Sequence, residues 1–129
     1  MKLEGRVLLY DTMNKNRDIF PKTCEITMPK KVPLYWDFQH YNGAIGIAEV
    51  TKDELGLIAK VETIPNPLIK EDALKSIFED GKFGVGGYYN QVKKHNDGNL
   101  IIIDKASLRD ISFVLAPVHE EYYLKIVEE

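Results

Sequence analysis

Short runs of apolar and β-branched residues, separated by glycine, proline and polar turns, dominate the pattern along this chain of 129 residues. Several of the runs alternate apolar with polar positions, which is typical of strands that bury one face. The pattern predicts strands over residues 3–10, 32–38, 44–51, 57–61, 83–92, 100–103, 111–115 and 122–127. The sequence 53–56 predicts a hairpin turn between two of these strands.

One segment has the pattern of a helix. Asn66 and Pro67 supply a cap and a first-turn proline, and Gly81 supplies the end. The apolar residues between them fall on roughly one face: Leu68, Ala73, Leu74, Ile77 and Phe78. The whole pattern predicts a single domain over residues 1–129, of the α+β class and mostly β. We expect a small closed or partly closed β-barrel of six to eight strands with one or two helices.

Composition supports an ordinary folded domain and argues against one class of partner. Hydrophobic residues make up 44% and charged residues 29% of the chain, which excludes a disordered tail or a coiled-coil rod. Seventeen basic residues against twenty acidic ones give a formal charge of −3. Nucleic-acid binding depends on neutralising phosphates, so we expect no nucleic-acid partner. The pairs Lys30–Lys31 and Lys93–Lys94 are too short to form a basic patch.

The single cysteine, Cys24, cannot form an internal disulfide and therefore gives no sign of an oxidising compartment. No run approaches the ~18 apolar residues that a membrane helix requires, and the first residues lack the pattern of a signal peptide. We therefore expect a reducing, aqueous environment without membrane contact.

Several segments, read in order, resemble the prohead (capsid-maturation) proteases of tailed phages, which are relatives in fold of the herpesvirus assemblins. An apolar strand ends in a histidine at His40, and a glycine-containing strand follows it. Late in the chain, residues 108–117 resemble a Leu-x-Glu-hydrophobic-Ser-hydrophobic-Val run that ends near a proline. The matching segments are 11, 16–20, 32–40, 43–47, 53–57, 78–81 and 108–117.

The resemblance implies a serine nucleophile, a histidine that takes its proton and a third group that orients the imidazole. It places the histidine at His40 and the third group at Asp110, where the family usually has glutamate. The family's Ser-hydrophobic-Gly-aromatic run corresponds to residues 85–88, so Val85 occupies the serine position. Valine can neither attack a carbonyl nor release a proton, and a shift of register offers only Gly84 or Gly86. The resemblance therefore implies a degenerate site without catalysis.

Plainer interpretations of these residues remain open. His40 could be a strand-end histidine that packs beside Trp36 or Tyr41, and Asp110 could be a charged residue on the outward face of a strand. Four other side chains could in principle act as nucleophiles, although none lies in a nucleophile motif: Cys24, Ser76 in the helix, Ser107 in a loop, and Ser112 within the late strand.

The sequence indicates no metal or cofactor. His95 and His119 lie in turn-like contexts without ligand spacing. The glycines Gly81, Gly84, Gly86 and Gly87 follow a helix and enter a strand, which is the reverse of the order that directs amides at phosphate. We interpret them as sites of close backbone packing.

These observations lead us to expect a non-enzymatic phage virion component, an auxiliary or decoration protein of the capsid that acts through protein–protein contacts. The expected partners are the major capsid protein or other head proteins, with possible self-association on the shell, in a virion assembled in the host cytoplasm. The chain ends twelve residues after Pro117, whereas the family's proteases extend further, so we expect the bare domain.

The tyrosines at 35, 41, 88, 89, 122 and 123 offer interface residues, about half of which we expect in the core. Two alternatives stay open: an active maturation protease with an unrecognised nucleophile near His40, and a binding module unrelated to capsids.

Overall fold

The computed structural model describes all residues, 1–129, as nine strands, one α-helix and one 3₁₀ turn. The elements in chain order are β1 (Lys2–Leu9), β2 (Asp18–Ile19), β3 (Glu25–Thr27), β4 (Val32–Trp36), η1 (His40–Asn42), β5 (Gly46–Lys52), β6 (Gly56–Thr63), α1 (Glu71–Ile77), β7 (Phe83–Asp97), β8 (Leu100–Phe113) and β9 (Tyr123–Glu128).

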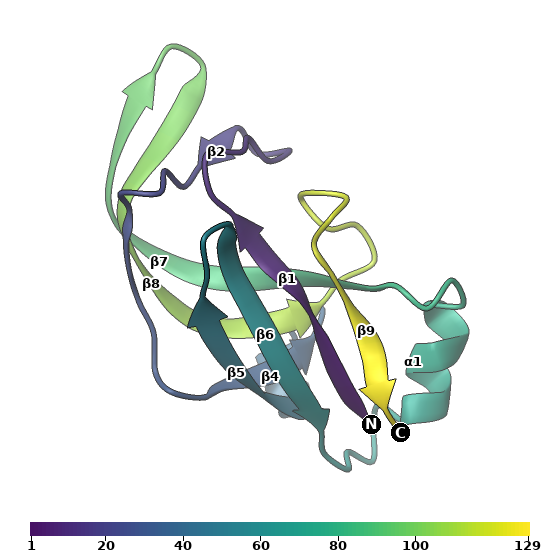
Figure 1. Cartoon of the computed structure of the whole chain (residues 1–129). Coiled ribbons are helices and arrows are strands. Elements are labelled where there is room, and N and C mark those ends of the chain that lie inside the picture. The colour runs from purple at the N-terminus through teal and green to yellow at the C-terminus, as the bar shows by residue number, and fades with distance from the viewer.

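Seven strands close into a barrel (Figure 1). Their order is β8-β4-β5-β6-β1-β9-β7, and β7 pairs with β8 to complete the ring. The two short strands β2 and β3 lie outside this ring and pair in parallel with β8. The prediction of a mostly β, α+β barrel of six to eight strands with one or two helices is confirmed.

The hairpin of β7 and β8 is much longer than the other strands, at 15 and 14 residues. Its inner half belongs to the barrel, and its outer half projects away from it (Figure 1). We call this outer half, residues 92–105, the arm. The sequence predicted two separate strands over 100–103 and 111–115, and this prediction is wrong. β8 is continuous because β7 pairs along one edge while β2, β3 and β4 follow one another along the other.

The helix is shorter than predicted and begins at Glu71 rather than at the Asn66–Pro67 pair. The Asn66 side chain does not cap a helix. Its Oδ1 accepts a hydrogen bond from the Leu68 backbone at 2.8 Å, and its Nδ2 donates to the Asn42 carbonyl at 3.0 Å. Asn66 therefore stabilises a local turn and ties it to η1.

One apolar cluster of 26 buried residues fills the barrel. The rings of Phe78, Phe83 and Phe113 pack against one another, with centroids 5.2–6.0 Å apart. Val85 and Leu34 are fully buried in the same cluster. This core anchors β4, β7 and β8, the three strands that position the residues expected at the site. No helix of the structure is long and apolar enough to cross a membrane.

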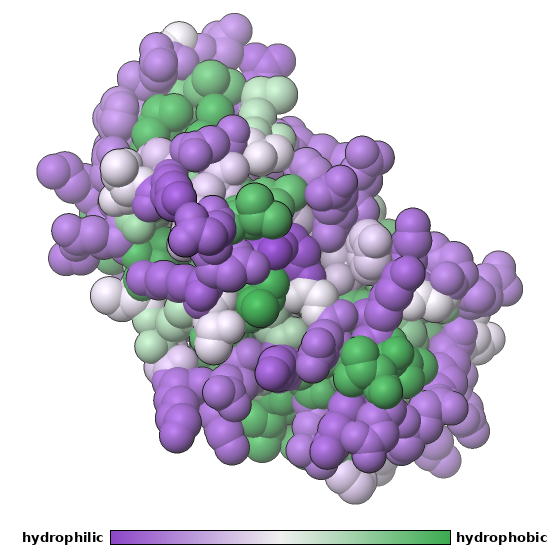
Figure 2. Space-filling view, in the orientation of Figure 1, coloured by the Kyte–Doolittle hydropathy of each residue, from purple (hydrophilic) through white to green (hydrophobic).

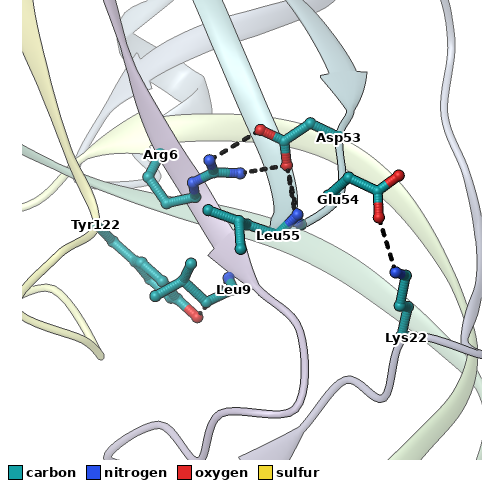
Figure 3. Close-up of polar contacts among 8 residues, drawn as sticks. Arg6, Leu9, Lys22, Asp53, Glu54, Leu55 and Tyr122 are labelled. Atoms are coloured by element: carbon teal, nitrogen blue, oxygen red, sulfur yellow. Dashed lines mark hydrogen bonds and ion pairs between the residues drawn. The ribbon is translucent and has the colours of Figure 1, made fainter.

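The turn between β5 and β6 is held to β1 by a polar clamp (Figure 3). The two terminal nitrogens of Arg6 donate to the two carboxylate oxygens of Asp53 at 2.7 and 2.9 Å. The Arg6 hydrogen bond holds the pKa of Asp53 at about 2. Gly56 has a φ of 154° at this turn, and a Cβ there would lie 2.0 Å from the Leu8 carbonyl oxygen, so only glycine fits.

Candidate functional site

The segment after β4 turns sharply across the outside of the barrel. Asp37 and Phe38 both have positive φ, 47° and 56°, which is unusual for two consecutive residues with side chains. Such a conformation persists only where the surrounding structure holds it. Here the Asp37 backbone N–H donates to the Phe113 carbonyl at 2.8 Å, and further bonds from Ser112 complete the support.

Ser112 fastens this turn to β8. Its Oγ accepts a hydrogen bond from the Phe38 N–H at 2.7 Å and donates to the Tyr35 carbonyl at 2.9 Å. The residue is fully buried, so both bonds are shielded from water. The hydroxyl therefore supports the backbone of the turn.

This turn places the His40 side chain next to that of Asp110. His40 begins η1, and its Nε2 lies 3.2 Å from Asp110 Oδ2 on β8. The His40 side chain is about half exposed, whereas that of Asp110 is 9% exposed. The structure thus brings together two of the three positions that the resemblance placed at the site.

A β-bulge lies at Asp110 and directs its side chain. Tyr88 pairs with Asp110, but its neighbour Tyr89 pairs with Leu108, so Arg109 has no partner on β7. Leu108 and Ile111 are both fully buried in the core, and the extra residue between them lets Asp110 face outward. Asp110 thus lies on the outer face of β8, which one of the open interpretations gave it, but it is buried because the His40 segment covers it.

Burial raises the pKa of the Asp110 carboxyl above its ordinary value, and the neighbouring His40 partly opposes this shift. Asp110 Oδ1 is buried without a hydrogen-bond partner, which increases the cost of ionisation. The pair therefore places a carboxyl group where it can orient the His40 imidazole. Such a pair can move a proton when a nucleophile lies within hydrogen-bond reach of the ring.

The Val85 side chain does not lie near the His40–Asp110 pair. It is fully buried in the core cluster and pairs with Phe113, another core residue. Side chains alternate between the two faces of a strand, so Val85 points into the barrel, whereas Tyr88 lies on the outer face with Asp110. The other outer-face positions in this part of β7 are Gly84 and Gly86. The position that the resemblance assigned to serine therefore lies on the far side of the sheet from His40.

Aromatic rings surround His40. The rings of Tyr35 and Tyr88 meet the imidazole edge to face, with centroids 4.5 and 6.0 Å away. Tyr88 is 51% exposed and Tyr41, next to His40 in the chain, is 83% exposed. His40 therefore packs beside Tyr35 and Tyr88, rather than beside Trp36 or Tyr41. We call the surface formed by His40, Tyr41 and Tyr88 the His40 face.

A pocket of about 350 Å³ adjoins this face along the inner half of β7. Phe38 and Tyr88 form part of its wall, and the backbone of Gly86 and Gly87 forms another part. A Cβ at Gly86 would lie 3.3 Å from the Phe38 ring, and one at Gly87 would lie 2.7 Å from the Tyr89 ring. The two glycines thus allow rings to lie directly on the strand. Of the four glycines predicted to pack closely against backbone, Gly84 does so at the Val114 carbonyl, whereas Gly81 has no atom within 4 Å of its Cβ position, so the prediction is wrong there.

Two tyrosines at this pocket differ in how their hydroxyls are satisfied. The Tyr122 hydroxyl accepts a hydrogen bond from the Leu9 backbone N–H at 3.0 Å (Figure 3). The Tyr89 hydroxyl is buried without a partner, and burial strongly raises its pKa. Of the six tyrosines expected to divide between core and surface, Tyr122 is buried, Tyr41 and Tyr88 are exposed, and the other three are half-buried.

The remaining candidates lie apart from the His40 face. Ser76 is in α1, and Ser107 is within β8 rather than in the predicted loop. His95 is in β7, where its Nδ1 lies 2.6 Å from Asp104 Oδ2. His119 Nδ1 accepts a hydrogen bond from the Glu121 N–H, and Cys24 is buried. No group of three or more possible metal ligands is present.

Comparisons with protein families, with curated proteins and with solved structures find no match to this chain. The resemblance to prohead proteases therefore rests on the sequence segments given above. Sequence reasoning missed Ser112 as the support of the His40 turn and Tyr88 as the ring that packs against His40 opposite Asp110 in the strand pair. The pairing of β7 with β8 could have indicated Tyr88, but the bulge at Asp110 leaves no sequence signal.

Proposed function

We propose that this protein is a non-enzymatic component of a phage virion, an auxiliary or decoration protein that binds head proteins through its His40 face. One observation carries the proposal. The face retains the oriented His40–Asp110 pair, but the β7 positions that point toward it are Gly84, Gly86 and Tyr88. Neither glycine has a side chain to attack a carbonyl, and the Tyr88 ring meets the His40 imidazole edge to face, without a hydrogen bond from its hydroxyl that would activate it as a nucleophile.

The exposed aromatic residues support binding as the role of this face. Tyrosine is enriched at the centres of protein interfaces, where a large ring contributes contact area and a hydroxyl contributes a hydrogen bond. The exposed Tyr88 ring packs against the half-exposed His40, and the exposed Tyr41 follows His40 in the chain. The adjoining pocket offers space for a side chain of the partner, and ten of its sixteen lining residues are hydrophobic.

The first test is the copy number of the protein in purified mature particles, measured by quantitative mass spectrometry against the major capsid protein. A resident component gives a ratio that corresponds to whole capsomers. Presence in immature particles and absence from mature ones would contradict the proposal and favour a protease or an assembly factor.

The His40–Asp110 contact itself favours a second candidate, a maturation protease that uses an unrecognised nucleophile. In that case, incubation with unprocessed head protein gives specific cleavage that His40→Ala abolishes. The virion-component proposal instead predicts no cleavage by either protein. The matched control is His119→Ala, which removes a half-buried imidazole that stacks on Tyr122 and makes no contact with the His40 face.

A further inference from the structure

The outer edge of β7 is open for most of its length. Of the residues of β7, only Phe83 and Gly84 pair with β9, and the next residue, Val85, donates its backbone N–H to the Tyr122 carbonyl. From Gly86 to Asp97, β7 pairs with β8 on one edge and with no strand on the other. The last part of this open edge lies on the arm, which projects clear of the barrel (Figure 1). An open edge with unpaired backbone groups is a template for another strand.

The arm carries features that prevent indiscriminate pairing. The register between β7 and β8 shifts on both sides of Lys93, and Lys94 follows directly. Bulges and edge lysines are the usual means by which proteins block open-ended aggregation. Lys93 also lies opposite Lys105 on β8, and like charges in directly opposite positions destabilise a strand pair. The arm therefore favours an added strand that places an acidic residue beside Lys93.

A second copy of the arm meets that requirement. Two identical strands that pair antiparallel about a two-fold axis place one residue opposite its own copy. When this residue is His95, Lys93 of each copy lies opposite Asp97 of the other, and Lys94 lies opposite Asn96. When it is Lys94, the two Lys94 side chains oppose each other. Charge thus selects the register that is centred on His95.

We propose that the protein self-associates as a two-fold dimer through antiparallel pairing of the β7 edge over residues 93–97, centred on His95. The dimer joins the two β7–β8 hairpins, each already paired with its own β2 along β8, into one continuous sheet, and it pairs backbone groups that are open on the β7 edge of each copy. It also extends the apolar surface of the arm, where Val92 is 56% exposed and Leu100 and Ile102 are half-buried. Hydrophobic side chains gather on the arm among hydrophilic ones (Figure 2).

The proposed interface is small, so association is weak and depends on concentration. Sedimentation velocity of the full chain from about 10 µM to about 1 mM covers the affinity range expected for such an interface. We expect the average mass to rise toward that of a dimer. Lys93→Glu and Asp97→Lys each place like charges in opposition twice, and each weakens association by about tenfold or more.

Mixing the two variants provides the most specific test of the register. A heterodimer of Lys93→Glu with Asp97→Lys pairs Glu with Lys at one contact and the native Asp97 with the native Lys93 at the other. The mixture therefore regains the association that each variant lacks alone. Lys30→Glu, an exposed substitution in the turn before β4 with the same change in charge, associates like the native protein.

A chain that stays monomeric over the whole range would overturn the proposal, as would a mixture that fails to recover. Amide chemical shifts give an independent readout on the native protein. We expect those of residues 93–97 to change with concentration while those of the inner edge, residues 86–91, stay constant. Changes confined to the inner edge or to the barrel would also overturn it. None of these outcomes depends on the proposed role in a virion.

Discussion

Strands β7 and β8 present one face to the barrel core and the other to the segment that carries His40. On the core face, Val85 and Phe113 lie opposite each other and are fully buried. On the outer face, Asp110 and Ser112 hold a strained turn and an imidazole. Neighbouring residues of one strand therefore have unrelated chemistry, and a change of register by one residue exchanges their roles. The comparison shows that a site position on a strand is defined by its face as much as by its place in a motif.

The largest effect is expected for Val85→Ser, which places a hydroxyl in the core. Lost apolar contacts and a buried hydroxyl without a partner should lower the free energy of unfolding by about 3 kcal/mol. Urea denaturation measures this loss. The variant should also remain unlabelled by a fluorophosphonate probe, because its hydroxyl points away from His40.

Gly86→Ser is the matched control on the outer face. A Cβ there lies 3.3 Å from the Phe38 ring, at the edge of a pocket, so a small adjustment accommodates it. We expect a change of less than about 1 kcal/mol in unfolding free energy. Equal losses for the two variants would contradict the assignment of the two faces.

Ser112→Ala should have the next largest effect. It leaves the Phe38 N–H and the Tyr35 carbonyl without their hydrogen-bond partner, in a turn with positive φ at two residues. A loss of about 2 kcal/mol in the free energy of unfolding is expected. Hydrogen exchange at the Phe38 amide should also accelerate. An unchanged exchange rate would show that Ser112 does not hold the turn.

The two tyrosines at the pocket should respond in opposite directions to the same substitution. Tyr122→Phe removes the acceptor of the Leu9 N–H and should cost about 1 kcal/mol of stability. Tyr89→Phe removes a buried hydroxyl without a partner and should leave stability unchanged or increase it by up to about 1 kcal/mol. Thermal unfolding of both variants under the same conditions measures the difference. Equal losses would mean that the Tyr89 hydroxyl has a partner.

The smallest effect concerns the dependence of stability on pH. The folded state raises the pKa of Asp110 above its ordinary value of 3.8, so it binds a proton more tightly than the unfolded chain. The stability of the native protein relative to Asp110→Asn should therefore fall as the pH rises from about 4 through the raised pKa. Asp53, with a pKa of about 2, should behave in the opposite way. The contribution of Asp53 to folding stability is present above about pH 4 and is lost as the pH falls toward about 2. Denaturation of the two Asp→Asn variants from about pH 2 to well above the raised pKa of Asp110 tests both signs.

The barrel was predictable from the sequence because local patterns of apolar and polar residues indicate most of its strands. Alternation of apolar and polar residues marked the main strands, and glycine and polar turns separated them. The short strands β2 and β3 were missed, because two or three residues held by the edge of β8 have no pattern of their own. The helix was predicted too long, because the Asn66 side chain has the chemistry of a helix cap but bonds instead to Asn42 and Leu68.

The candidate site was predictable only in part. The resemblance to prohead proteases marked His40 and Asp110, and the fold brings His40 Nε2 within 3.2 Å of Asp110 Oδ2. The bulge at Asp110 and the left-handed turn at Asp37 and Phe38 depend on contacts between distant strands. Local sequence therefore could not reveal which β7 residues share a face with His40.

The central claim is that the His40 face binds head proteins and does not cleave them. The most direct test compares two variants of the protein in purified particles. Copy number in purified capsids would be measured by mass spectrometry after complementation with His40→Ala or with the double variant Tyr41→Ala, Tyr88→Ala. The account predicts that His40→Ala leaves head-protein processing unchanged, whereas the double variant is depleted from the particles. Unprocessed head protein in the His40→Ala particles would contradict it and establish His40 as part of a protease.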